Sequence, residues 1–212
     1  MGSKVRLGAG ALFLAPFRPA PALSSQLSVA LFRVYHPRME SFEDMLTGGH
    51  PNSLGRTVEV VDCVLADPPR IEDLYACYHS TDEVVRLRVS NALRRVEAEN
   101  HDLLVPLIDR LIEEIGALDQ PSAQWTLAKL FEALWDDMSA RQKTAAMAIM
   151  QRNLAQHDDW IVLNNSMQVL FDLSRRYDLD DVKAFLRPHL TRLQADGRKS
   201  VASRAKKLLA RL

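Results

Sequence analysis

Apolar residues recur at three- and four-residue intervals through most of the chain after Met39, and no long stretch alternates apolar with polar residues. This period is that of an amphipathic α-helix, whereas a half-buried strand alternates every second residue. The pattern therefore predicts an all-α domain over residues 39–212, built from paired helices. First helices are expected at residues 71–79, 101–117, 140–155 and 180–195, second helices at 81–98, 122–137, 158–175 and 198–211, and a degenerate first pair at 41–46 and 54–66.

The apolar stripe of the second helices repeats along the sequence. Its first copy comprises Val85, Val89, Ala92 and Leu93, which share one helix face. Equivalent stripes follow at a nearly constant step, at Ala123, Leu127, Leu130 and Phe131, at Val162, Ser166, Val169 and Leu170, and at Val201, Ala205, Leu208 and Leu209. One helix pair cannot bury such a stripe alone, so successive pairs must stack. The sequence thus predicts an α-solenoid of about four to five antiparallel helix pairs.

Local signals mark several helix ends. Pro121, Ser139 and the pair Asp158-Asp159 are typical of the first turn of a helix, where a cap and a negative charge are favourable. Gly197 is expected to separate the last two helices.

The second helix at 81–98 carries a VR-x-x-V-x-x-AL pattern that includes Arg86, and Asp82-Glu83 form an acidic turn before it. The repeat period, about 39 residues, lies in the range of two-helix solenoid repeats. With this period and with Pro106 and Pro188 interrupting two first helices, the segment 70–212 resembles the HEAT-repeat family. The later copies depart from the pattern, because Gln124, Leu163 and Ala202 stand at the position of Arg86, so armadillo and other α-solenoids remain alternatives. The resemblance implies a right-handed stack with a groove that usually binds protein and sometimes nucleic acid.

Helical geometry selects a candidate binding row. With the apolar stripe of residues 81–98 facing inward, Leu87, Asn91 and Arg94 point away from it. If second helices line the groove, as the resemblance implies, this row and its counterparts face a partner. The predicted partner-binding residues are Asn91, Arg94, Trp125, Lys129, Asn164, Gln168, Phe171 and Lys207. Trp125 and Phe171 would be exposed anchors; in the alternative, both pack against the neighbouring repeat.

Residues 1–38 differ in character from the rest of the chain. They are basic and acid-free, and Pro16, Pro19 and Pro21 interrupt them. We interpret them as a disordered or non-native extension; a secretory signal and a mitochondrial-type presequence are the alternatives. Their apolar run is too short to span a bilayer as a helix.

The zero net charge conceals an uneven distribution. Residues 1–39 carry five Lys or Arg and no acid, residues 40–182 carry net −13, and residues 183–212 carry nine bases with Asp196 as their one acid. The expected last helix, 198–211, is amphipathic and basic. It is interpreted as a capping helix with a solvated face, or as a contact for an acidic partner or nucleic acid.

No motif of catalysis or cofactor binding stands out. The six histidines form no HxxxH or His-Glu pair, and there is no GxSxG, no P-loop and no βαβ-associated GxGxxG. Cys63 and Cys77 are too far apart in sequence for a CxxC site and are interpreted as small buried residues. His101 and His157 are expected in solvated or capping roles. The sequence therefore predicts a protein without enzymatic activity, cofactor or metal.

The predicted function is that of a cytoplasmic scaffold that binds a protein or peptide. The sharper alternative is a DNA-binding protein similar to the HEAT-like alkylpurine DNA glycosylases, with Trp125, Trp135, Trp160, Asp136-Asp137 and Asp158-Asp159 as superficial candidates. Trp135 is, however, expected in the core and Trp160 at an inter-helix corner. The acidic body argues against DNA, since phosphate binding needs a basic surface. A lyase or chaperone-like subunit that handles a cofactor is a third possibility.

Overall fold

The computed structural model describes residues 40–50 and 52–212, and Glu40–Leu212 form one compact unit. The expected N-terminal extension, residues 1–38, lies outside the described residues. The described part is all-helical and contains no strand, which confirms the predicted class. Its ten α-helices are α2 (Phe42–Leu46), α3 (Thr57–Ala66), α4 (Ile71–Ala76), α5 (Glu83–Glu99), α6 (Ile108–Glu113), α7 (Pro121–Ala133), α8 (Ala140–Gln156), α9 (Trp160–Arg176), α10 (Asp180–Leu193) and α11 (Lys199–Leu209).

Three helices begin where start signals in the sequence predicted. Asp159 caps α9, since its Oδ1 accepts the backbone amides of Ile161 and Val162. Ser139 and Gln142 form a reciprocal capping box at the start of α8. Pro121 is the first residue of α7, where a missing amide proton costs nothing.

Of the two prolines expected to interrupt first helices, Pro106 does so and Pro188 does not. The predicted helix 101–117 is not continuous: short 3-10 turns at His101–Leu103 and Val105–Leu107 precede α6, and a third at Ile115–Ala117 follows it. Pro106 lies within the second turn, because proline and the residue before it disfavour a regular α-helix. Pro188, in contrast, does not interrupt α10. Pro188 and Ala184, whose carbonyl loses its amide partner, are both exposed, so water can satisfy that carbonyl.

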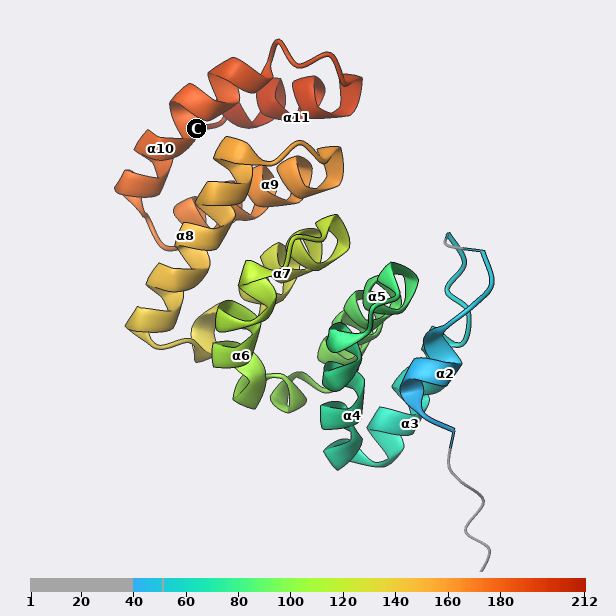
Figure 1. Ribbon diagram of the computed structural model, residues 1–212. Coiled ribbons are helices and arrows are strands. Elements are labelled where there is room, and N and C mark those ends of the chain that lie inside the picture. Colours follow the sequence, from blue (N-terminus) through green and yellow to red (C-terminus); the bar gives the residue numbers. More distant parts are fainter. Residues whose placement is uncertain (1–39, 51) are drawn as a thin grey trace, which may run out of the picture. The chain divides into compact units, whose positions relative to one another are not determined.

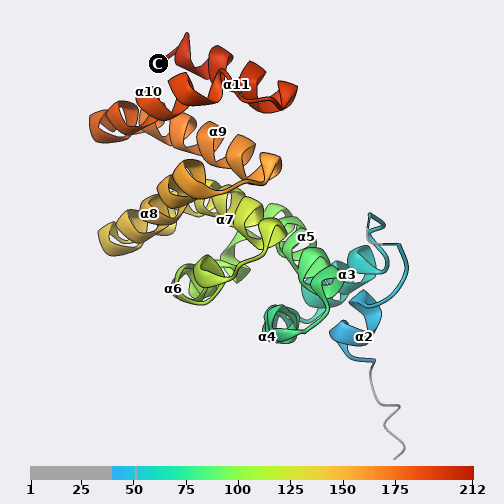
Figure 2. The same cartoon turned by 45° about the horizontal axis from the view of Figure 1, so that its top comes forward.

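The second helices pack in chain order, with α3 against α5, α5 against α7, α7 against α9 and α9 against α11. The first helices lie beside them, as Figures 1 and 2 show, with α8 and α10 both packed against α9. Fifteen of the sixteen stripe residues that defined the repeat are buried. The remaining one, Leu209, is the last residue of α11 and is half-buried.

The turns between paired helices repeat one hydrogen bond. The residue before the second helix donates its backbone amide to the residue two positions earlier, at 3.1, 2.9, 2.9 and 2.8 Å in four successive turns. The acceptors are Ser80, Leu118, His157 and Asp196, which occupy equivalent positions of successive repeats. The accepting atom is a side-chain atom in Ser80, His157 and Asp196 and the backbone carbonyl oxygen in Leu118. The sequence period therefore recurs as a contact at the turn, and His157 has the turn-capping role that was expected.

Gln124 departs from the VR motif in residue type, but it makes an equivalent contact. Arg86 Nη1 donates to Ser80 O at 2.6 Å, and Gln124 Nε2 donates to Leu118 O at 2.8 Å. The two donors are one repeat apart, and so are the two acceptors. The second copy thus preserves the contact that ties the helix to its preceding turn.

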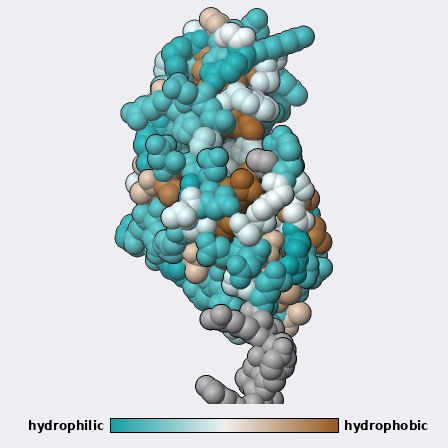
Figure 3. Space-filling view, turned by 45° about the vertical axis from the view of Figure 1, so that its right-hand side comes forward, coloured by the Kyte–Doolittle hydropathy of each residue, from teal (hydrophilic) through white to brown (hydrophobic). Residues whose placement is uncertain are grey.

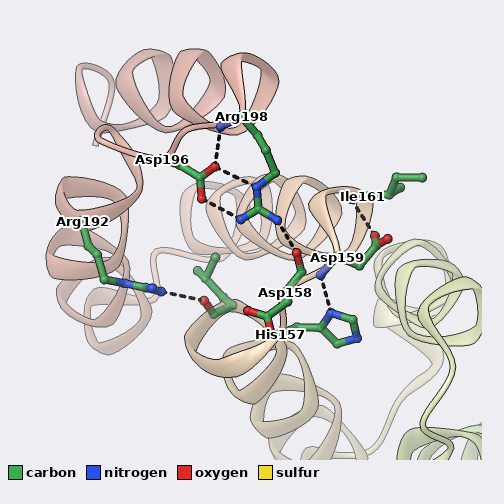
Figure 4. A network of polar contacts seen from close by, with 8 residues as sticks. His157, Asp158, Asp159, Ile161, Arg192, Asp196 and Arg198 are labelled. Atoms are coloured by element: carbon green, nitrogen blue, oxygen red, sulfur yellow. Dashed lines mark hydrogen bonds and ion pairs between the residues drawn. The ribbon is translucent and has the colours of Figure 1, made fainter.

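Polar side chains also join each pair to the one before it. Figure 4 shows this for the last two pairs, where Arg198 forms an ion pair with Asp196 and also donates to a carbonyl of the turn before α9. In four such contacts, a long side chain donates a hydrogen bond to a backbone carbonyl that lies 36 to 40 residues earlier in the chain. These donor and acceptor pairs are Gln120 with Glu83, Arg152 with Gly116, Arg192 with Leu154 and Arg198 with Asp158.

Arg88 has this role at the N-terminal end and is only 2% exposed. It donates to the carbonyls of Leu46 and Gly48 at 2.6 Å each, of Ser53 at 3.1 Å and of His50 at 3.2 Å. One guanidinium therefore holds the segment between α2 and α3 against α5. The apolar pattern gave no sign of this contact.

Candidate functional site

A trough made of two adjoining hollows crosses the second helices. Its first part, between α3 and α5, has a volume of about 680 Å³. Its second part, of about 170 Å³, extends from α5 over α7 to the start of α9. Asn91 and Arg94 line both parts and so join them. We call this surface, lined by residues of α3, α5, α7 and α9, the trough.

The trough combines apolar walls with polar groups. Val58 is 48% exposed, Leu65, Trp125 and Ile161 are half-buried, and all four line it. Seen from the side of the second helices, brown apolar side chains reach the surface in the middle of the view, with teal polar ones around them (Figure 3). Exposed apolar groups rimmed by polar ones are typical of an interaction surface.

Asn91, Arg94 and Asn165 supply the polar groups at the centre. Asn91 Oδ1 accepts from Arg95 Nε at 3.2 Å, and Asn165 Nδ2 donates to Trp125 O at 3.3 Å, which fixes both amides. Arg94 is exposed and makes no hydrogen bond or ion pair with any described residue. Its guanidinium is therefore available to an outside carboxylate.

The structure brings only some of the predicted binding residues together. Asn91, Arg94 and Trp125 line the trough. Lys129 is half-buried and forms an ion pair with Glu132 at 2.9 Å. Gln168 is half-buried between Asp172, to which it donates at 2.9 Å, and Arg204, from which it accepts at 3.0 Å. Lys207 is exposed on α11.

The expected exposure of Asn164 and Phe171 was wrong. Asn164 is 5% and Phe171 2% exposed. Phe171 is covered because α11 packs on α9 and the guanidinium of Arg211 lies 5.4 Å from the ring centroid. The alternative, packing against the neighbouring pair, is therefore confirmed for Phe171. Asn164 Oδ1 is buried without a hydrogen-bond partner among the described residues.

Trp160 was also placed wrongly, because it is 48% exposed rather than packed in a corner. The equivalent residues of α5, α7 and α11 are Glu83, Pro121 and Lys199, and they are exposed as well, so this position faces solvent in the last four pairs. Trp135, in contrast, is buried as expected.

Sequence reasoning missed Val58, Ile161 and Asn165 as trough residues. Ile161 and Asn165 lie four positions apart on one face of α9, one position beyond the row that was chosen. Val58 belongs to α3, whose pair was considered degenerate and was left out of the row. The signal that could have found Val58 is an apolar residue one position past the start of a second helix.

The titratable side chains of the described part form no evident reaction centre. Burial raises the pKa of the Cys77 thiol to about 11, so the thiol is protonated at neutral pH. His101 lies between Glu97 at 3.0 Å and Asp137 at 2.8 Å, and these hydrogen bonds, that of Glu97 first, raise its pKa. Within residues 40–50 and 52–212, no three His, Cys, Asp or Glu side chains gather in a way that would hold a metal ion.

No described helix is long and apolar enough to cross a bilayer. Comparisons of the chain with protein-family models, with curated proteins and with solved structures found no match.

Proposed function

We propose that the chain is a HEAT-like α-solenoid scaffold that binds an extended segment of a protein partner in the trough, without catalysis. The observation that carries the proposal is the trough itself, which combines partly exposed apolar walls with Arg94, unpaired among the described residues, across four helices. The repeated turn hydrogen bond and the successive packing of α3, α5, α7, α9 and α11 support the solenoid.

The dimensions of the trough favour a peptide over a small molecule. Neighbouring helices pack about 8–10 Å apart, so the path from α3 to α9 is about 24–30 Å long. An extended chain advances about 3.3 Å per residue, so about seven to nine residues fill it. Trp125 and Ile161 offer an apolar anchor point, and Arg94 a charge-assisted hydrogen bond.

The test is selection of random 16-residue peptides displayed on phage against the full chain, followed by affinity measurements on the recovered peptides. Trp125→Ala and Arg94→Glu should each weaken binding about tenfold, or 1.4 kcal/mol. Arg187→Glu is the matched control, since Arg187 is exposed on α10 and outside the trough. Failure to recover any peptide, or equal losses in all three variants, would contradict the proposal.

We also propose that the protein acts in the cytoplasm. Cys63 and Cys77 are both free thiols, which fits a reducing compartment. Immunofluorescence in the native host checks this, and a signal from a secretory compartment would oppose it.

DNA binding, including glycosylase-like activity, is the second candidate function. Its support is the basic end of the chain, where α11 carries four Lys or Arg and no acid. Burial of Trp135 removes one of the aromatic residues that could have held a base. A mobility shift of plasmid DNA at moderate salt, or base release from alkylated DNA, would favour this candidate over peptide binding.

A further inference from the structure

A cluster of four cationic side chains lies where α9 meets α11. It consists of Arg175, Arg204, Lys207 and Arg211, which we call the basic cluster. Arg175 Nη1 donates to Arg211 O at 2.9 Å, and both guanidinium groups lie over the ring of Phe171, at 6.0 and 5.4 Å from its centroid. Two like charges are thus both held near one aromatic ring.

The basic cluster has little internal compensation. Among the described residues, no carboxylate forms an ion pair with any of its four members. The neighbouring acid is Asp172, which accepts from Gln168, and Gln168 in turn accepts from Arg204. Arginines whose positions are fixed by stacking and that lack carboxylate partners bind outside carboxylates with little loss of side-chain entropy.

The basic cluster lies at the end of the repeat row that begins at Asn91. Lys207 occupies the repeat position that Asn91 has on α5, and Arg175 on α9 occupies the position of Ala98. Asn91 and Ala98 both line the trough. The row that begins at Asn91 passes through Lys129 and Gln168, which are half-buried and do not line the trough. Gln168 accepts from Arg204, so this row leads from the trough to the basic cluster.

The charge along this face changes from mixed at one end to positive at the other. Asp62 and Glu99 line the first part of the trough, and Arg94 and Arg95 lie beside them. The far end carries the basic cluster, and the segment 183–212 that forms most of this end has nine bases and one acid. A partner that follows the face therefore meets mixed charge first, an apolar middle next and positive charge last.

We propose that the partner is a protein segment with an apolar residue seated at Trp125 and Ile161 and with acidic residues about five or six positions away, lying on the basic cluster. The separation follows from two helix intervals of about 8–10 Å, from α7 to α11, divided by about 3.3 Å per extended residue. This inference rests on the proposed function, because it needs a peptide in the trough.

An acidic protein segment fits better than a nucleic acid. A phosphate backbone carries charge at every residue, so it would also lie against Asp62 and Glu99. Residues 40–182, which form the rest of the unit, carry net −13 and would repel it. A polypeptide can confine its negative charge to the end where the cations lie.

The experiment extends the peptide selection to the charge pattern. Peptides recovered with the full chain should carry Asp or Glu about five or six positions from an aromatic or aliphatic residue. Lys207→Glu alone should weaken binding of the recovered peptide about tenfold, and so should the combined Arg175→Gln and Arg211→Gln variant. Trp125→Ala should also weaken binding, because it removes the contact with the apolar residue of the peptide. Lys207 is exposed and makes no hydrogen bond or ion pair among the described residues, so its substitution leaves folding intact.

Lys206→Glu is the matched control, with the same charge change one residue away. The residues equivalent to Lys206 in the earlier pairs, Ser90, Ala128 and Met167, are buried under the next pair, so Lys206 faces away from the trough. Its substitution should leave affinity within twofold. Equal losses for Lys206→Glu and Lys207→Glu would overturn the proposal, since they would reflect net charge alone.

The outcomes separate this inference from the function beneath it. Peptides without acidic residues that still depend on Trp125 and Arg94 would refute the charged end and leave peptide binding in place. Recovery of no peptide would refute both. Displacement of a recovered peptide by a 20-nucleotide single-stranded DNA at lower concentration than by the free peptide would assign the basic cluster to nucleic acid and overturn the proposal.

Discussion

Arg88 offers the sharpest test of how the N-terminal end is held together. We predict that Arg88→Met destabilises the chain by about 3–5 kcal/mol. The bond to Leu46 O is buried, and a buried bond to a charged donor contributes about 1.5–3 kcal/mol. The three bonds to Gly48, His50 and Ser53 are part-buried, and water replaces part of each when the guanidinium is lost.

The measurement is urea unfolding of the full chain followed by circular dichroism at 222 nm, with Arg94→Met as the control. Arg94 is also on α5, but it is exposed and unpaired among the described residues, so its change should cost less than about 0.5 kcal/mol. Hydrogen exchange should show that α2 and α3 lose protection first, because Arg88 joins them to α5. A loss of stability below about 1 kcal/mol for Arg88→Met would refute the reasoning, because the four carbonyls left without a donor would then contribute too little to hold this segment.

Three further predictions follow from the same structure. Gly55→Ala should destabilise the chain by about 1–3 kcal/mol more than Gly48→Ala in urea unfolding. Both glycines have positive φ, but a Cβ at Gly55 would lie 2.9 Å from Arg88 Cζ, whereas a Cβ at Gly48 would have no described atom within 4 Å. Equal losses would disprove the close contact. His101 has a raised pKa, so its contribution to stability is complete below the ordinary value of 6.5 and is lost as pH rises through the folded-state pKa. His101→Gln should therefore cost more stability at about pH 6 than at about pH 9. A difference in stability that does not change with pH would contradict this. Asn164→Leu removes a buried oxygen without a hydrogen-bond partner among the described residues, so it should be neutral or raise the melting temperature by a few degrees, and a clear fall would show that the amide has a partner.

The repeat was readable from the sequence because burial enforces it. A stripe residue such as Val89 or Leu93 is buried by neighbouring helices and must therefore be apolar. The helical period and the longer step between pairs are for this reason both visible in the sequence. Helix starts were readable for a similar reason, because the cap at Asp159 is a local contact that reaches only to Val162.

The misplaced features depend on contacts far apart in the chain. Arg88 reads as a surface arginine until the loop that contains His50, in the preceding pair, closes over its guanidinium. Phe171 was assigned to the groove because helix geometry alone gives a direction, whereas the packing of α11 decides whether that direction is open. Pro106 and Pro188 are the same residue type with opposite outcomes, so the presence of a proline alone did not decide whether the helix breaks.

The trough was half predictable for the same reason. Asn91, Arg94 and Trp125 were found from one row of one helix face. Ile161 and Asn165 lie on an adjacent row of α9, so a strict row-by-row transfer missed them. Val58 was missed because α3 departs too far from the repeat pattern to be aligned with the other second helices.

The central claim is that the second helices present a peptide-binding trough, and backbone amide shifts of the isotope-labelled chain during titration with a recovered peptide test it most directly. The account predicts the largest shifts at Asn91, Arg94, Trp125 and Asn165. It predicts unchanged amides at Lys143 and Gln151, which line a separate hollow between α8 and α10. Shifts concentrated at that hollow, or spread evenly over both faces, would contradict the claim.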